Sequence, residues 1–531
     1  MQNFSIINPN GVTKPKTEFN NHLFAQSFYD LKLSRVLQVS PVNINGSMIN
    51  YSLAEFLTDD IDTIKHRLDV FEDLQKCRGL FELLRDTALP AISNLSTLSA
   101  SRDENEYYFL NQLYSVKRLT VYVECIECLH KELSGFSIRS RGITDFAKEI
   151  TALYTSREFI DLKENMEKIN LRFKNIKSIT VGINIGDGMQ IDTMGIVSIN
   201  EESYKSGRLL DRLLSADFLL SEEFSLLTPL EPVFKNLDTA QKFEANRAFK
   251  SAFDSLLRKT LRNVPKDVSS YMRNQTQFMI NLLPEMCFLI AGHEMLMSLK
   301  SQGMSICKPE ISTTRVTSLT HLYHPQLLET TEPAKITRNS VTFDGDGMFY
   351  VLSGANSGGK SVFLHSVGIA QILFQLGLYV PATEASMLPV DYMCLQHSAE
   401  ITTHNSAGRL EQECIALNQM LKVVTKNSLI LVDEAFSSTS AYDGSLLAEE
   451  LLKHFARIGC RGVFSTHIHD LPIERINSYP RATIKVDTLM VVTADGTRTY
   501  RVERQKPDGL SHAQDIARKY GLLLAEEETL Q

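Results

Sequence analysis

A glycine-rich loop in the C-terminal half constrains the fold of this chain more than any other feature. An apolar run at residues 349–352 precedes eight residues of the pattern G-x-x-x-x-G-K-S, and residues 362–378 then read as a helix. The eight residues are Gly354, Ala355, Asn356, Ser357, Gly358, Gly359, Lys360 and Ser361. A strand, a glycine-rich turn and a helix in this order indicate an α/β domain built around a phosphate-binding loop.

The residue types of this loop suit a nucleoside triphosphate and its metal ion. Glycines let the backbone curl until its N–H groups converge on phosphate oxygens. Lys360 can neutralise the β and γ phosphates, and the Ser361 hydroxyl can bind Mg²⁺. Val362 begins the following helix, whose positive N-terminus faces the same phosphates. The loop therefore predicts an ATPase that binds ATP and Mg²⁺.

Two further apolar runs end in side chains that fit ATP hydrolysis. Residues 428–432 lead into Asp433, which suits direct or indirect contact with Mg²⁺, and Glu434, which suits a general base for the attacking water. Residues 462–466 lead into His467, which can sense the γ phosphate. The alternatives are a solvated acidic turn after the first run and a hydrogen-bonded structural histidine after the second.

The chain divides by texture into three parts. Residues 1–45 are mixed in composition and read as an N-terminal arm. Residues 46–305 carry helical periodicity, interrupted by strict alternation near 177–200 that predicts a small β insertion. Residues 306–531 alternate short apolar strands, turns and helices. The middle part fits either antiparallel levers with a tip or an ordinary helical bundle with a hairpin.

Composition limits the classes of protein further. The net charge of −8, from 55 basic and 63 acidic residues, argues against a broadly basic surface that coats nucleic acid, although a local basic patch is compatible with it. We find no secretion signal and no apolar run of about 18 residues, so we expect a cytoplasmic protein without a membrane span. Cys125, Cys128 and His130 resemble half of a zinc site, but their helical spacing favours core packing.

The ordered motifs resemble those of the MutS family of DNA mismatch-repair ATPases, which are relatives of the ABC-type ATPases. Besides the loop and the strand ending in Asp433, the motifs are His324-Pro325 and residues 337–342, 437–444 and 465–471. Asn356 within the loop and the Thr-Ser-x-Tyr-Asp-Gly run are more specific than the loop pattern alone. The resemblance covers residues 317–521, and the helical region before it is similar, more weakly, to the family's core and lever domain.

This resemblance implies an ABC-type α/β P-loop ATPase domain preceded by a mostly α-helical core and lever domain. The β insertion occupies the place of the family's DNA clamp, in reduced form. Ile336 and Asn339 match the segment that cradles adenine. The family also implies a homodimer that holds ATP between subunits, with Gly408, Arg409 and Asp443 contacting the partner's site.

Departures from the family pattern shape the expected function. Phe-x-Glu, the mismatch-reading motif, is absent from the sequence, and Leu410-Glu411-Gln412 replaces the usual Ser-Thr-Phe run. We expect no separate mismatch-recognition and connector domains. We therefore predict a dimeric, ATP-hydrolysing switch that binds DNA, as branched or mismatched duplex, in repair or recombination, without direct mismatch reading. The alternative is a P-loop switch or scaffold that acts on protein or RNA, which the acidic charge and small β insertion favour.

Overall fold

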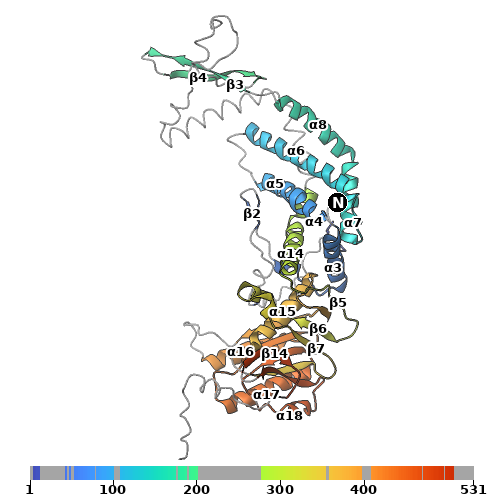
Figure 1. Ribbon diagram of the computed structural model, residues 1–531. Helices are drawn as coiled ribbons and strands as arrows, with labels where there is room; N and C mark the ends of the chain where they lie inside the picture. The colour runs from blue at the N-terminus through green and yellow to red at the C-terminus, as the bar shows by residue number, and fades with distance from the viewer. Residues whose placement is uncertain are drawn as a thin grey trace, which may run out of the picture.

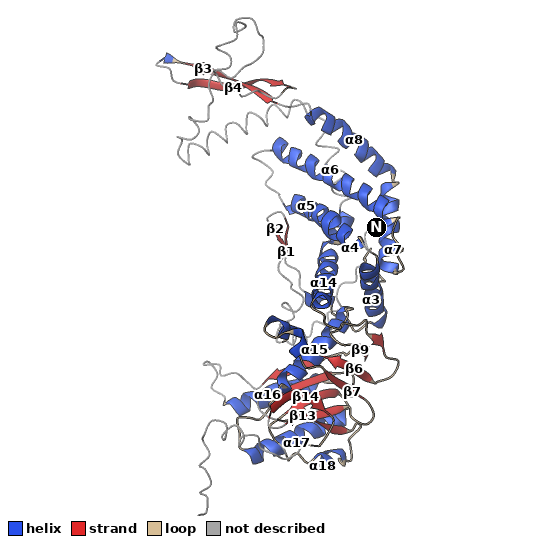
Figure 2. Cartoon of the chain, in the orientation of Figure 1, coloured by secondary structure: helices blue, strands red, loops and turns tan. Residues whose placement is uncertain are grey.

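The chain is elongated, with a helical part and a sheet-containing part placed end to end (Figure 1). A two-stranded hairpin, β3 (Ser178–Ile185) and β4 (Ile191–Asn200), lies at the end farthest from the larger sheets (Figure 2). The computed structural model describes residues 4–11, 31, 42–44, 47–49, 53–77, 79–100, 108–174, 178–187, 191–200, 202, 277–354, 358–397, 408–468, 470–494 and 497–506.

The helical part is assembled from amphipathic helices around a central apolar one. Its larger helices are α3 (Ile61–Lys76), α5 (Leu89–Ala100), α6 (Tyr108–Leu133), α7 (Arg141–Tyr154), α8 (Arg157–Lys174) and α14 (Leu283–Ser301). The shorter elements are β1 (Val42–Ile44), β2 (Ser47–Ile49), η1 (Leu53–Phe56), α4 (Leu80–Glu82), the π-helical η2 (Leu83–Ala88) and α13 (Gln277–Asn281). Helix α3 begins where the Asp60 carboxylate accepts the Thr63 N–H at 3.0 Å.

The main sheet of the C-terminal part has six strands in the order β10-β11-β12-β8-β13-β14. Their bounds are β10 (Met393–His397), β11 (Leu429–Asp433), β12 (Arg461–Ser465), β8 (Phe349–Ser353), β13 (Val486–Ala494) and β14 (Thr497–Glu503). The first five run parallel and β14 pairs antiparallel with β13. Strands β8, β11 and β12 are buried along their whole length, as expected for parallel strands covered on both faces.

The helices of this part cover the main sheet, and their bounds are α15 (Lys360–Leu376), α16 (Arg409–Val423), α17 (Ala441–Ile458) and α18 (Ile473–Asn477). Tyr350 and Leu352 of β8 face a core that continues through α15 into the helical part. Phe349 and Val351 of the same strand face a second core shared with α16 and α17. Helix α15, which follows the glycine-rich loop, therefore connects the main sheet to the helical part.

A second sheet of four strands, in the order β5-β9-β6-β7, adjoins the first. Its strands are β5 (Glu310–Ile311), β9 (Glu384–Met387), β6 (Thr317–Leu322) and β7 (Asn339–Phe343). The segment that joins β6 to β7 contains the short turns η4 (Pro325–Glu329) and η5 (Pro333–Lys335). Because β7 lies next to β14, this segment is carried to the edge of the main sheet.

The two parts meet at the C-terminal end of α15, where a buried arginine joins them. Arg67 of α3 is 3% exposed and donates to the carbonyl oxygens of Ile7, Phe56 and Leu376. Gly377 ends α15 at φ +77°, and a Cβ there would lie 2.4 Å from the Arg67 Cβ. Glycine is required at this position both by its backbone conformation and by the close approach of α3.

Part of the predicted N-terminal arm is built into this junction. Ile6 and Ile7 are completely buried, and the Glu285 carboxylate of α14 accepts the Ile6 N–H at 2.7 Å. The His66 Nε2 atom lies 2.8 Å from the Ile6 carbonyl oxygen. Residues 4–11 therefore pack as an extended segment without regular secondary structure between α3 and α14.

Several predicted elements are confirmed and others lie outside the described residues. The strands at 349–352, 428–432 and 462–466 and the β insertion are present within two residues of the expected bounds. Within the predicted helical part, residues 203–276 lie outside the described residues. Cys125 lies buried in α6, and burial raises the pKa of its thiol to about 12, which suits core packing.

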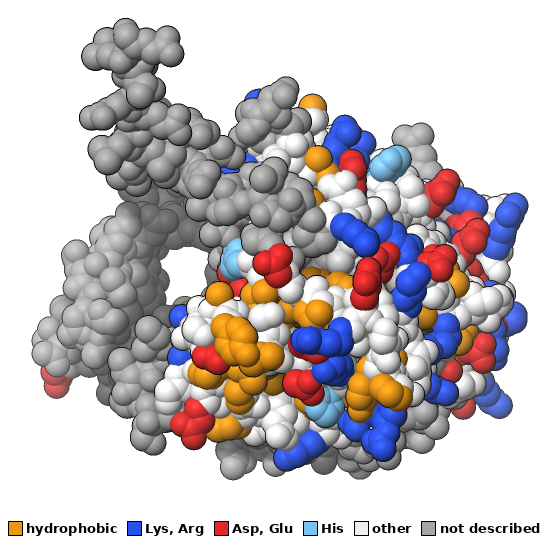
Figure 3. All heavy atoms as spheres, turned by 90° about the horizontal axis from the view of Figure 1, so that it is seen from below, with side chains coloured by type: hydrophobic (Ala, Val, Ile, Leu, Met, Phe, Trp, Pro, Cys, Tyr) orange, Lys and Arg blue, Asp and Glu red, His pale blue; other side chains and the backbone are white. Residues whose placement is uncertain are grey.

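The surface of the sheet-containing end carries charges of both signs. Figure 3 views the molecule from this end and shows basic and acidic side chains interspersed with exposed hydrophobic ones. Such interspersed charge creates no broad field of one sign on this face. Among the helices of the described residues, none combines the length and the apolar character needed to cross a membrane.

Candidate functional site

Three neighbouring parallel strands end at one edge of the main sheet and bring the predicted residues together. Strand β8 leads into the glycine-rich loop, β11 into Glu434, and β12 into His467. The backbone holds these ends side by side, because the Glu434 N–H donates to the Ser465 carbonyl at 3.1 Å and the Thr466 N–H to the Leu352 carbonyl at 3.0 Å. Loops at the carboxyl edge of a parallel sheet are the usual place for a ligand site.

Lys360 is a buried cation at the start of α15. Gly359, at φ +97°, turns the chain into the helix, and Lys360 is 3% exposed. Its Nζ donates to the Gly354 carbonyl at 3.0 Å and lies 4.0 Å from Glu434 Oε1. Burial lowers the pKa of Lys360, while the charges of Glu434 and Asp433 raise it. A buried ammonium that contacts the loop backbone at Gly354 is well placed to attract a phosphate anion.

Glu434 and His467 form the second part of the site. Glu434 Oε1 lies 2.7 Å from His467 Nε2, and His467 Nδ1 lies 3.4 Å from Lys360 Nζ. Both side chains are about one-third exposed, so they face solvent as well as Lys360. Glu434 has a φ of +55°, an unfavourable conformation for a residue with a side chain. Strain of this kind is commonly held in place at functional sites.

Asp433 and Ser361 supply oxygen ligands of the kind that Mg²⁺ prefers. Asp433 is 8% exposed, and its Oδ1 atom accepts a hydrogen bond from Ser465 Oγ at 2.7 Å. In the described part of the chain, no group of three or more His, Cys, Asp or Glu side chains could hold a metal by itself. The residues present fit Mg²⁺, because this ion usually takes one or two protein ligands and completes its shell with phosphate and water.

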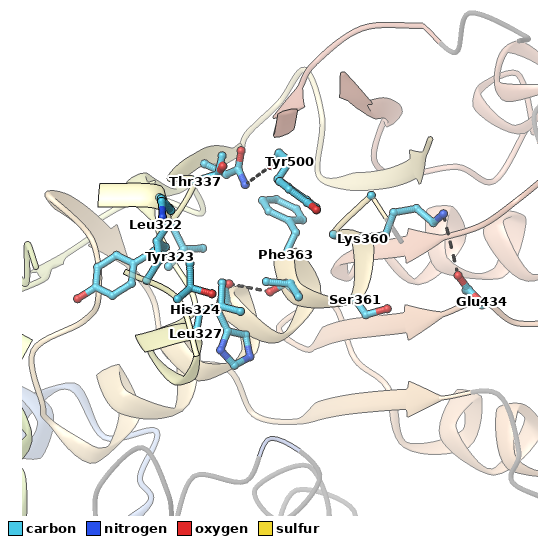
Figure 4. Close-up of a pocket in the computed structure, with 18 residues that line it drawn as sticks. Leu322, Tyr323, His324, Leu327, Thr337, Lys360, Ser361, Phe363, Glu434 and Tyr500 are labelled. Carbon is cyan, nitrogen blue, oxygen red and sulfur yellow. Dashed lines mark hydrogen bonds and ion pairs between the residues drawn. The ribbon is translucent and has the colours of Figure 1, made fainter. Parts of the chain in front are cut away.

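A cavity of about 550 Å³ opens beside Lys360. Figure 4 shows Lys360, Ser361 and Glu434 at one end, Leu322, His324 and Leu327 at the other, and Phe363 and Tyr500 between them. The cavity thus has a charged end and a mainly apolar end. Its described lining consists of Leu322, Tyr323, His324, Leu327, Thr331, Lys335, Ile336, Thr337, Asn339, Gly358, Gly359, Lys360, Ser361, Val362, Phe363, Ser366, Glu434 and Tyr500.

Ile336 and Asn339, expected near adenine, both line this cavity. The Asn339 amide donates to the Tyr500 carbonyl at 3.1 Å, and its oxygen accepts the Val502 N–H at 2.8 Å. Asn339 therefore fastens β14 against β7 and holds Tyr500 at the cavity wall. Tyr500 and Phe363 were not predicted, because no local pattern marks an aromatic side chain that reaches a site through the pairing of distant strands.

The other predicted site residues are only partly placed. Ala355, Asn356 and Ser357 of the loop lie outside the described residues. Gly408 and Arg409 are exposed at the start of α16, and Asp443 is exposed in the first turn of α17, where its N–H donates to Ser440 Oγ at 3.1 Å. None of these last three belongs to the described lining of the cavity.

Two protein-family models match consecutive parts of the chain. The family model described as MutS2 N-terminal domain matches residues 59–302, which contain the larger helices of the helical part. The model described as MutS domain V matches residues 350–522, which contain the loop, Asp433, Glu434 and His467. The two models follow one another along the chain and together cover most of the described structure.

Curated relatives agree with the family models. The chain is 36% identical over 159 residues to the DNA mismatch repair protein MSH2 of Saccharomyces cerevisiae, covering 30% of this chain and 16% of the relative. It is 24% identical to the DNA mismatch repair protein MutS of Clostridium perfringens, covering 67% and 38%, and 25% identical to that of Macrococcus caseolyticus, covering 72% and 43%. The chain thus spans less than half the length of these relatives. From the two family models and these relatives it follows that the chain belongs to the MutS family.

Proposed function

We propose that this chain binds ATP and Mg²⁺ in the cavity beside Lys360 and hydrolyses the γ phosphate. The observation that carries the proposal is the cluster of a buried lysine, a carboxylate and a histidine within 4.0 Å of one another at the carboxyl edge of the sheet. Phosphoryl transfer to water needs groups that bind the phosphates and a group that positions the attacking water, and a P-loop lysine beside a carboxylate and an imidazole can supply both.

Each residue of the cluster has a separate role in this proposal. Lys360 and the loop backbone bind the phosphates, and Ser361 and Asp433 hold Mg²⁺, which supplies charge to stabilise the transferring phosphoryl group. Glu434 orients the attacking water and accepts its proton. His467 lies against Glu434 Oε1 and keeps the carboxylate turned toward Lys360.

The apolar lining of the cavity provides surfaces that can bind the nucleotide base. Phe363 and Tyr500 present two aromatic surfaces in the middle of the cavity (Figure 4), and Ile336 adds an aliphatic surface to the lining. An aromatic ring stacks on any nucleobase with useful affinity. We therefore place adenine against Tyr500, with the phosphates running toward Lys360.

We further propose that two copies of the chain face each other across this site. Tyr442 and Leu446 lie one turn apart on α17 and are 74% and 44% exposed, and Val362 at the start of α15 is 37% exposed. Large apolar side chains exposed around a site are typical of a surface that a partner covers. In the dimer, Gly408, Arg409 and Asp443 would contact the nucleotide bound to the other copy.

We propose DNA as the macromolecular substrate, acted on in repair or recombination, because the relatives are named as DNA mismatch repair proteins. The hairpin at 178–200 favours a second candidate, in which the lever tip contacts protein or RNA. This segment contains Asp187 and Asp192 but no lysine, arginine or histidine, and it exposes Val181 and Val197. DNA phosphates would find no cation on it.

The hydrolysis proposal is tested by steady-state ATPase assays on Glu434→Gln and the parent chain. We expect the variant to bind ATP with unchanged affinity and to hydrolyse it at least about 100-fold more slowly. Equal turnover in both proteins would remove Glu434 from the role of base.

The substrate proposal is tested by measuring binding to duplex and branched DNA between 50 and 200 mM salt, with and without ATP. We expect affinity for DNA that falls steeply with salt, because binding to phosphates releases counterions. If neither DNA form binds at low salt while a single-stranded RNA does, the second candidate is favoured.

A further inference from the structure

A buried carboxylate on α16 contacts the loop that carries Glu434. Glu413 is 1% exposed, and its Oε1 atom accepts the Phe436 N–H at 3.0 Å. Leu417 and Met420 lie on the same buried face of α16. Glu413 is thus the acidic member of an otherwise apolar contact between α16 and the residues that follow β11.

Burial of this carboxylate is unfavourable in itself. Desolvation raises the pKa of Glu413, and only the hydrogen bond from Phe436 and the charge of Arg409 lower it. An apolar side chain of similar size would fill the space without that penalty. The hydrogen bond to the Phe436 backbone is therefore the specific contribution that a carboxylate makes at this position.

The loop held by this bond is strained. Glu434 has a φ of +55° and Phe436 a φ of +63°, both in the left-handed region that side chains disfavour. The Glu434 N–H is held by the Ser465 carbonyl at 3.1 Å and the Phe436 N–H by Glu413. Two hydrogen bonds, one to β12 and one to α16, thus hold the backbone of residues 434–436.

We propose that Glu413 is a positioning residue that holds Glu434 in its orientation toward Lys360. The proposal rests on the proposed ATPase function and adds to it a link between α16 and the base. Because α16 begins at Gly408 and Arg409, a second copy that displaces this helix would move Glu434 through one hydrogen bond.

The test compares Glu413→Leu, which keeps an apolar contact and removes the acceptor, with Glu413→Gln, which keeps an acceptor oxygen. We expect the leucine variant to lose at least about tenfold in kcat with the KM for ATP within about threefold of the parent, because misplacing a catalytic group chiefly slows the chemical step. The glutamine variant should recover most of the parent's kcat.

A matched control is Glu449→Leu on α17. Glu449 is also buried, at 4% exposure, but it pairs with Arg475 and Lys453 away from the cavity. Its replacement should lower stability and leave kcat within about twofold of the parent. If Glu449→Leu lowers kcat as much as Glu413→Leu does, general loss of stability explains the result and the positioning role is refuted.

Hydrogen exchange of backbone amides provides a readout that requires neither ATP turnover nor a variant as stable as the parent. We expect Glu413→Leu to speed exchange in a peptide spanning 434–440 while exchange in β8 and α15 is unchanged. Parent-like exchange in that peptide, or a parent-like kcat, would overturn the proposal. If the parent itself hydrolyses no ATP, the proposed function fails, and the exchange experiment still decides whether Glu413 holds the loop.

Discussion

Arg67 joins α3 to the C-terminal end of α15 and to two segments near the N-terminus, and Arg67→Met tests how much these contacts stabilise the chain. The guanidinium donates to the Ile7, Phe56 and Leu376 carbonyls and to Asn8 Oδ1 at 2.9 Å. Methionine keeps the aliphatic stem and removes all of these donors. The variant therefore isolates the hydrogen bonds from the packing.

The expected loss follows from burial. Arg67 is 3% exposed, and burial lowers the pKa of its guanidinium to about 10, with the charge of Glu285 acting in the opposite direction. Removing one member of a buried, hydrogen-bonded charged network typically costs about 3–5 kcal/mol. We expect Arg67→Met to lower the free energy of unfolding by an amount in this range, because the acceptors of Arg67 come from three separate segments and water cannot replace every hydrogen bond.

Urea unfolding monitored by circular dichroism measures this loss, with Arg85→Met as the control. Arg85 also lies over a phenylalanine ring and beside a carboxylate, Asp86, but its side chain is 41% exposed. We expect the control to lose less than about 1 kcal/mol, as exposed ion pairs do. With an unfolding slope of about 3 kcal/mol per molar urea, Arg67→Met should lower the midpoint by about 1 M or more. Equal midpoints for the two variants would refute the role given to Arg67.

Three further perturbations follow from the structure. Contacts with Lys308 and then with Lys76 lower the pKa of Glu72 from 4.5 to about 2. In urea titrations, the difference in free energy of unfolding between the parent and Glu72→Gln should therefore be constant near neutral pH and shrink as the pH falls from 4.5 toward 2. A difference that is independent of pH would contradict this. Tyr500→Ala should weaken ATP binding about tenfold through lost stacking, and unchanged calorimetric affinity would place the base elsewhere. Gly462→Ala should prevent the chain from reaching the parent's fold, because a Cβ at this position would lie 2.2 Å from the Ile430 carbonyl oxygen. A melting temperature equal to that of the parent would contradict that geometry.

The sequence was sufficient to find the chemical centre of the site, because its residues follow buried strands in a fixed order. Glu434 and His467 follow apolar runs, Lys360 belongs to the glycine-rich loop after a third run, and the structure places the three side chains within 4.0 Å of one another. Their roles in hydrolysis stay predictions. The apolar runs are recognisable because a parallel strand buried on both faces needs apolar residues at every position.

The positions of some residues depend on contacts between segments far apart in the sequence, and local sequence patterns could not predict them. Tyr500 reaches the cavity only because Asn339 fastens β14 to β7. Glu413 and Arg67 each lie among other polar residues of their helices, yet both are at least 97% buried. A charged side chain in a helix gives no sign in the sequence of which backbone groups its burial will satisfy.

Calorimetric titration of the parent chain and of Lys360→Ala with ATP and Mg²⁺ tests whether ATP binds at Lys360. We expect one ATP per chain for the parent and at least about 100-fold weaker binding for the variant, about 2.7 kcal/mol, because a buried cation in contact with the phosphates is removed. Binding of equal affinity in the two proteins would contradict the placement of ATP at Lys360.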